Sequence, residues 1–177
     1  LPNQRDGISK LPAVPTAGIA LDVGPMLVHR ARMRLDDAVL TVLAANDYGS
    51  LKLCDLPNSN LYLIGIEADL SLTKEGNTNG LVAASDLDVG MGTAPASNTT
   101  LATTMIDVAA KQDLDDNELT LPFRVHSNDE SKLPLKVADS STAALYLNLS
   151  GPDISANSSV RVSGTVDLFY VDLGKLV

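Results

Sequence analysis

The sequence contains no tryptophan, and aromatic residues make up only 3% of its 177 residues. Sugar-binding sites usually need an aromatic platform, and single-stranded nucleic acids stack their bases on several aromatic rings. The shortage of aromatic side chains therefore argues against both kinds of site. The formal net charge of −9 adds to this, because affinity for nucleic acid comes from lysine and arginine that neutralise phosphates. We expect no nucleic-acid partner.

Metal-ligating side chains are equally scarce. Cys54 is the single cysteine, so no disulfide can form within the chain, and the two histidines, His29 and His126, lie far apart. A structural zinc site needs four such ligands. No apolar run approaches the roughly 20 residues of a membrane-spanning helix. We expect no metal, no other cofactor and no membrane partner.

The acidic segment 113–118 is the best candidate for a cation site. Asp113, Asp115 and Asn117 supply oxygen ligands at the first, third and fifth positions of a calcium-binding loop. Glu118 stands where that loop needs glycine, and Arg124 stands where it needs a bidentate glutamate. A solvated acidic turn is the favoured interpretation. The sequence also lacks a G-x-S-x-G motif and any convergent acid, base and nucleophile, so we predict no catalytic residues and no enzyme.

What the sequence has in abundance is the two-residue periodicity of β-strands. Residues 30–35 alternate arginine with apolar side chains. Residues 144–149 predict another strand, and residues 159–173 begin with valines that alternate with polar side chains. Residues 60–73 form the longest such segment. Its predicted apolar face consists of Tyr62, Ile64, Ile66, Ala68, Leu70 and Leu72. The other face starts with Leu61 and Leu63 and becomes polar towards its end, which predicts a strand covered on both sides at first and solvated later. About eight strands separated by turn residues predict an all-β fold, an antiparallel β-sandwich or jelly roll.

Two segments interrupt this pattern. Residues 101–113 fit one face of a helix, so a short helix is an alternative to a strand there. Residues 119–125 read as a strand despite Pro122, which favours the edge of a sheet. Gly90 and Gly92 fall within another strand pattern and indicate a bulge or a close approach of a second backbone.

The first 17 residues differ from the rest. Their prolines block ladder hydrogen bonds, which predicts an extended N-terminal arm over residues 1–17 before a sandwich domain over residues 18–177. The arm is either an extended segment that lies on a neighbouring subunit or a disordered tail. Its candidate partner-binding residues are Arg5, Lys10, Pro12, Val14 and Pro15.

A basic stripe on the strand at residues 30–35 is the second candidate contact. Arg30, Arg32 and Arg34 share one strand face, and arginine makes bidentate pairs with the carboxylates of a partner. The alternative is pairing within the chain, with Asp36, Asp37 or an acidic residue of another strand.

Several segments resemble small structural proteins of tailed bacteriophages, especially marine phages. They are residues 89–94, 97–100, 144–149, 160–166 and 170–174, which read VGMGTA, SNTT, ALYLNL, VRVSGTV and YVDLG. As a family these are jelly-roll capsid decoration, or cement, proteins. The resemblance implies a β-sandwich without catalytic residues that sits on the capsid exterior of the virion, binds the major capsid protein and stabilises its lattice. It also implies a homo-oligomer, with a trimer favoured over a dimer.

Two other functions remain open. A carbohydrate- or receptor-binding module of a viral fibre would use loops 74–80 and 93–100 and an exposed Tyr48 or Tyr62. A tail-tube or head-completion protein would instead form rings.

Overall fold

The computed structural model describes residues 27–43, 46–75, 87–114, 118–126, 132–138, 142–151 and 157–174. The predicted arm, residues 1–17, lies outside them. In these segments the chain forms antiparallel strands and one short 3₁₀ turn, η1 (Thr103–Met105). The strands are β1 (Val28–Leu43), β2 (Tyr48–Asp55), β3 (Leu61–Lys74), β4 (Asp88–Gly92), β5 (Ala109–Asp113), β6 (Thr120–Val125), β7 (Leu135–Val137), β8 (Ala144–Ser150) and β9 (Ser158–Asp172).

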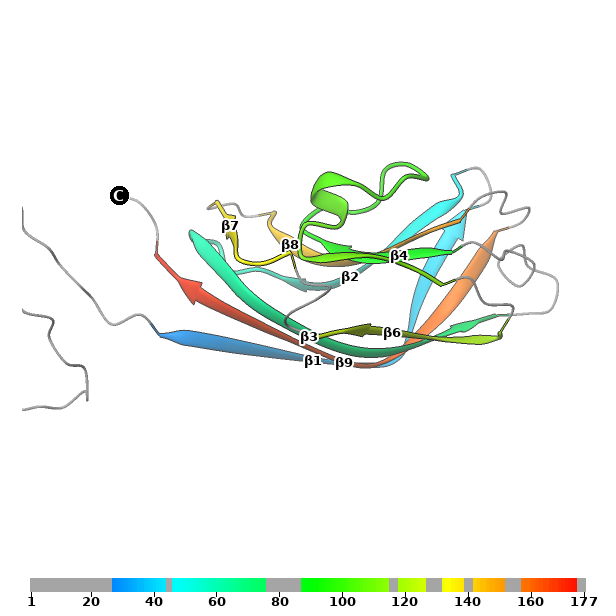
Figure 1. Cartoon of the computed structure of the whole chain (residues 1–177), viewed down its shortest axis with the longest axis horizontal. Helices are drawn as coiled ribbons and strands as arrows, with labels where there is room; N and C mark the ends of the chain where they lie inside the picture. Colours follow the sequence, from blue (N-terminus) through cyan, green and yellow to red (C-terminus); the bar gives the residue numbers. More distant parts are fainter. Residues whose placement is uncertain are drawn as a thin grey trace, which may run out of the picture.

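The strands build two packed layers (Figure 1). Their hydrogen-bonded order is β5-β4-β8-β2-β1-β9-β3-β6, with β7 added to β3. The strand ladder passes from one layer to the other where the end of β1 pairs with β2, at Val42 with Gly49 and Leu43 with Tyr48. One layer has the order β1-β9-β3-β6 and the other the order β2-β8-β4-β5, so in each layer strands from β1–β4 alternate with strands from β5–β9. This is the double-sheet arrangement of a jelly roll, and the predicted all-β sandwich is confirmed.

The core lies between the layers and follows the predicted alternation. In β9, Val160 and Val162 are buried, while Arg161 and Ser163 between them remain partly exposed. Removing apolar side chains from water is the main driving force for joining the two sheets. The buried apolar residues contributed by the two layers include Leu40, Val42, Leu63, Ile66, Leu70, Val89, Met91, Phe123, Leu145, Leu147, Val166 and Leu168.

A β-bulge in β3 reverses part of the predicted apolar face. The register between β3 and β9 shifts between Leu63 and Gly65. A bulge adds one residue to a strand and so moves the following side chains to the opposite face. Leu63 and Ile66 are both buried, whereas Tyr62 and Ile64 are each 40% exposed. The prediction that Tyr62 and Ile64 face the core is therefore wrong, while the prediction for the residues from Ile66 onward is confirmed.

The layer that contains β1 and β9 bends beyond its middle. The β1–β9 register shifts between Leu35 and Ala38, and Gly164 on β9 has φ +133°. A side chain is disfavoured at this φ, and a Cβ on Gly164 would lie 2.2 Å from the carbonyl oxygen of Asp69. From the start of β1 and the end of β9 up to this point, the two strands run nearly straight. On the other side of it, they turn toward the second layer (Figure 1).

The helical alternative for residues 101–113 is wrong. This segment contains the single turn η1 and then β5. Leu101, Met105 and Ile106 form a small apolar cluster of their own, whereas Val108 and Ala109 join the main core. Within the described segments no helix is long and apolar enough to cross a membrane.

Residues 119–125 behave as predicted. They form β6, which stands last in the order of the sheet, and Pro122 is exposed on it. Proline lacks the N–H that an inner strand would need for pairing on both sides, so an edge strand accommodates it.

Candidate protein-interaction face

The outer face of the β2-β8-β4-β5 layer is covered by the chain itself. Residues 93–106, which we call the strap, lie over it above β4 and β8 (Figure 1). Asn148 of β8 is completely buried beneath the strap. Its Nδ2 donates to the carbonyl oxygens of Ala94 and Met105 at 3.0 and 2.7 Å, and its Oδ1 accepts from the N–H of Ala96 at 2.9 Å. One side chain thus binds three backbone groups of the strap, and the N–H of Ala96 also donates to Ser50 Oγ at 2.7 Å.

The predicted close approach of a second backbone is confirmed at Gly92, and the predicted bulge is confirmed at Gly90, where the β4–β5 register shifts between Val89 and Met91. A Cβ on Gly92 would lie 2.2 Å from the carbonyl oxygen of Thr104, and one on Gly90 would lie 2.6 Å from a methyl group of Ile106. The strap therefore rests directly on the backbone of β4. Loop 93–100, a candidate recognition loop in the sequence analysis, is the first part of this anchored segment.

The opposite outer face, on the β1-β9-β3 layer, has no such cover among the segments that the structure describes. We call it the open face. The strand register sets its side chains in four rows that each cross β1, β9 and β3 in that order. The rows are Val28, Val171 and Tyr62; Arg30, Phe169 and Gly65; Arg32, Asp167 and Glu67; and Arg34, Thr165 and Asp69.

One end of the open face is apolar. Val28 is 55% exposed, and Tyr62 and Ile64 are 40% exposed. Val171 is buried between Val28 and Tyr62, so the side chains of this row are packed side by side. A contiguous apolar surface with polar neighbours is typical of a site of contact with another protein.

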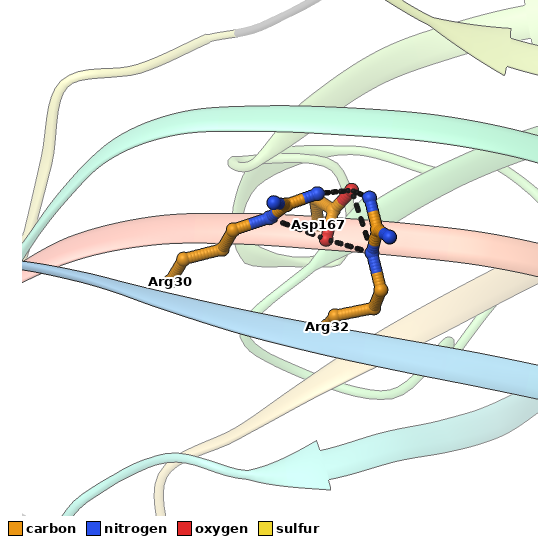
Figure 2. A network of polar contacts seen from close by, with 3 residues as sticks. All are labelled: Arg30, Arg32 and Asp167. Carbon is orange, nitrogen blue, oxygen red and sulfur yellow. Dashed lines mark hydrogen bonds and ion pairs between the residues drawn. The ribbon is translucent and has the colours of Figure 1, made fainter.

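A three-residue ion cluster lies in the middle of the open face (Figure 2). Arg30 donates from Nε and Nη2 to the two oxygens of Asp167, at 2.9 and 2.7 Å. Arg32 donates to the same two oxygens, from Nε at 2.9 Å and from Nη2 at 2.8 Å. The carboxylate is almost completely covered, whereas each arginine side chain remains 47% exposed. Asp167 therefore holds two guanidinium groups in place while much of their surface stays open to solvent.

The electrostatics of the cluster follow from these contacts. Hydrogen bonds from Arg32 and Arg30 hold the pKa of Asp167 well below its usual range, because they stabilise the charged carboxylate. The same bonds raise the pKa values of both arginines. The guanidinium carbon of Arg30 also lies 5.8 Å from the centre of the Phe169 ring, which is within the range of a cation–π contact.

The predicted basic stripe is thus split. Arg30 and Arg32 pair within the chain, but their partner is Asp167, not Asp36 or Asp37. Arg34 forms no ion pair with any residue placed by the structure, so it remains the unpaired member of the stripe. The arm candidates, Arg5, Lys10, Pro12, Val14 and Pro15, lie outside the described residues.

No motif in the sequence marks Asp167, Glu67 or the apolar row as parts of a site. Asp167 was on the predicted polar face of residues 159–173, but nothing in the sequence shows that this strand lies beside β1. His29, by contrast, lies on the core side of β1 as its position in the alternation predicts. Its ring stacks on that of Tyr170, with centroids 5.2 Å apart.

Metal-ligating side chains do not gather in the described part of the chain: no three His, Cys, Asp or Glu residues there are placed to hold an ion. In the predicted acidic turn, residues 115–117 lie outside the described segments.

A scan of protein-family models and a search of curated proteins both find no match. Solved structures do match. VP2 of infectious bursal disease virus, in its subviral particle, is 10% identical with a TM-score of 0.41, over 90% of this chain and 37% of that chain. The structure of Mud crab tombus-like virus is 12% identical with a TM-score of 0.32, over 88% and 94% of the two chains. The semi-empty virus-like particle of Macrobrachium rosenbergii nodavirus is 13% identical with a TM-score of 0.30, over the whole of both chains. This chain spans little more than a third of the VP2 chain.

Proposed function

We propose that this protein is a virion structural protein that binds the outside of a capsid and stabilises the lattice of the major capsid protein. The observation that carries the proposal is the open face, which sets an exposed apolar row beside fixed arginines on a two-layered jelly roll. Interfaces between proteins are enriched in tyrosine, phenylalanine and arginine, which are the residue types found here. The sequence resemblance to phage decoration proteins supports the same role.

Attachment to the capsid is assigned to the arm, residues 1–17. The proline-rich arm contains both basic residues, Arg5 and Lys10, and apolar ones such as Val14. An extended segment of this kind can add main-chain and side-chain contacts to a neighbouring subunit. Several copies joined in an oligomer would bind a repetitive lattice far more tightly than one copy, because each further contact becomes intramolecular.

A carbohydrate-binding module is the alternative function, and the exposed ring of Tyr62 favours it. A hollow of about 430 Å³ adjoins the open face, but aromatic rings do not line it. Its lining includes Asp69, Ser71, Pro122 and Arg124. Tyr48, the other candidate platform, is only partly exposed. Binding to a glycan array would favour this alternative.

The experiment that tests the proposal uses particles of the source virus. Mass spectrometry of gradient-purified particles should find the chain in many copies per particle, and gold-labelled antibodies should decorate the head. Heads stripped of the protein should rebind the full chain, and this should raise their disruption temperature, whereas a chain without residues 1–17 should rebind weakly. Absence from particles, or labelling confined to the tail, would overturn the proposal.

A further inference from the structure

We infer that the open face binds the open face of a second copy in a two-fold dimer, in which β1 of each copy lies over β3 of the other. The inference rests on the proposed function only in treating this face as a protein contact, and it leaves attachment to the capsid to the arm, residues 1–17.

The charges of the open face are segregated by strand. Arg30, Arg32 and Arg34 lie along β1, whereas Glu67 and Asp69 lie along β3, and β9 runs between the two strands. Rotation by 180° about an axis along β9 turns a second copy over and exchanges these two sides. Arg32 and Arg34 of one copy then lie above Glu67 and Asp69 of the other. A two-fold contact uses the same patch on both subunits, so such a patch must be self-complementary in this way.

Two charges of this face are free to make the contact. Arg34 and Glu67 are both exposed, and neither makes a hydrogen bond or ion pair within the segments that the structure describes. They lie in neighbouring rows of the face, an offset that the long arginine side chain can span. Arg30 and Arg32 are already oriented by Asp167, so they lose less side-chain freedom on binding.

The apolar row fits the same axis. Because the axis runs along the strands, each row stays opposite the equivalent row of the second copy. Tyr62 and Ile64 of one copy then meet Val28 of the other, and the exposed apolar surface of both is covered. The face lies on the straight part of β1 and β9 (Figure 1), which lets two sheets pack with their strands aligned to within about 30°.

A second copy suits this face better than a uniformly acidic partner does. Its arginines Arg30, Arg32 and Arg34 are matched by the carboxylates Asp167, Glu67 and Asp69. A uniformly acidic surface would pair with β1 but would repel Glu67 of β3, whereas Asp69 is already paired with Arg124 of β6 at 3.1 Å. Because like charges brought together at an interface weaken binding, a partner with the reverse pattern is favoured. The turned-over second copy has that pattern.

Sedimentation velocity of the full chain over a range of concentrations tests the inference. The unmodified chain should form a dimer that weakens in high salt. Arg34→Glu and Glu67→Lys, each alone, should weaken the dimer at least about tenfold. Each variant places like charges at residue 34 of one copy and residue 67 of the other, and the two-fold axis repeats this contact. An equimolar mixture of the two variants should restore it, because residue 34 of each chain again meets an opposite charge at residue 67 of the other. Thr99→Glu and Thr99→Lys, in the strap on the opposite side of the molecule, are the matched controls.

A monomer or a trimer at all concentrations would overturn the inference, as would a dimer that neither variant weakens. Weakening that mixing does not repair would also overturn it. Circular dichroism of each variant shows whether the chain is still folded, and so distinguishes loss of folding from loss of the dimer contact. The proposed function is tested on virus particles, so a negative result with the purified chain leaves it standing. The two-fold contact differs from the trimer that the sequence resemblance implies.

Discussion

Arg30 and Asp167 join the first and last strands of the fold through two parallel hydrogen bonds, although 137 positions separate them in the sequence. A planar guanidinium opposite both oxygens of a carboxylate is the strongest common form of ion pair. Arg32, which lies directly beside Asp167 in the same row, binds the same carboxylate. The cluster fixes the register of β1 against β9, the strand pair at the centre of the open face.

This cluster predicts a pH-dependent contribution to stability. The pKa of Asp167 is lowered in the folded chain, while in the unfolded chain it returns to about 3.9. A group whose pKa is lowered by folding stabilises the fold above its unfolded pKa and loses that effect as the pH falls. The contribution of Asp167 should therefore be complete above about pH 5 and shrink below about pH 4.

Asp167→Asn tests this directly. At pH 7 we expect its melting temperature to fall by about 2–4 °C, the range for a loss near 1 kcal/mol in a chain of this size. The difference from the unmodified chain should narrow as the pH drops from 5 to 3. Asp36→Asn is the control, since Asp36 is an exposed carboxylate of β1 without an ion pair to any described residue. A difference that stays constant with pH would contradict the assignment.

Asn148 provides the second prediction. Asn148→Asp keeps the shape of the side chain but places a carboxylate against the carbonyl oxygens of Ala94 and Met105. We expect the free energy of unfolding to fall by about 3 kcal/mol, because buried acceptors then lose their donor. Urea denaturation measures the loss, and faster proteolysis within residues 93–106 would show that the strap has loosened. Asn98→Ala, on the exposed part of the same strap, should change either measurement little.

The third prediction concerns Gly92. In Gly92→Ala the new methyl group would lie 2.2 Å from the carbonyl oxygen of Thr104, a backbone atom that cannot rotate away. The strap must shift, and we expect a loss of about 1–3 kcal/mol in the free energy of unfolding, as is usual for overpacking. Gly65→Ala is the matched control, because its methyl group would meet the Phe169 ring at an ordinary 3.5 Å. Equal effects of the two substitutions in thermal melts would contradict a close approach at Gly92.

The buried face of β9 could be predicted from the sequence because successive side chains of a strand point to opposite faces of the sheet. The valines at 160 and 162 are buried, and the polar residues beside them are not. The same rule failed at Tyr62 and Ile64. The bulge after Leu63 is set by pairing with β9, and its local signal in the sequence is Gly65, because a glycine inside a strand can mark a bulge. Pro122 was informative because a missing N–H restricts where a strand can lie in any sheet.

The candidate site was less predictable for a related reason. The arginine stripe was visible as a pattern, but its carboxylate partner depends on which strand lies next to β1. Asp36 and Asp37 were the nearest acids in sequence, yet the structure pairs the stripe with Asp167. Long-range pairing of this kind follows from the order of strands in the sheet, which a single sequence does not encode locally.

The single cysteine gives the last prediction. Cys54 on β2 is partly buried, and loss of solvent raises the pKa of its thiol above the usual value. Because the thiolate is the reactive form, Cys54 should react slowly with a thiol reagent at pH 7 in the folded chain and rapidly in urea. Free cysteine in the same buffer is the control, and the reaction can be followed by absorbance. A folded-state rate equal to that of free cysteine would contradict the partial burial of Cys54 against the main core.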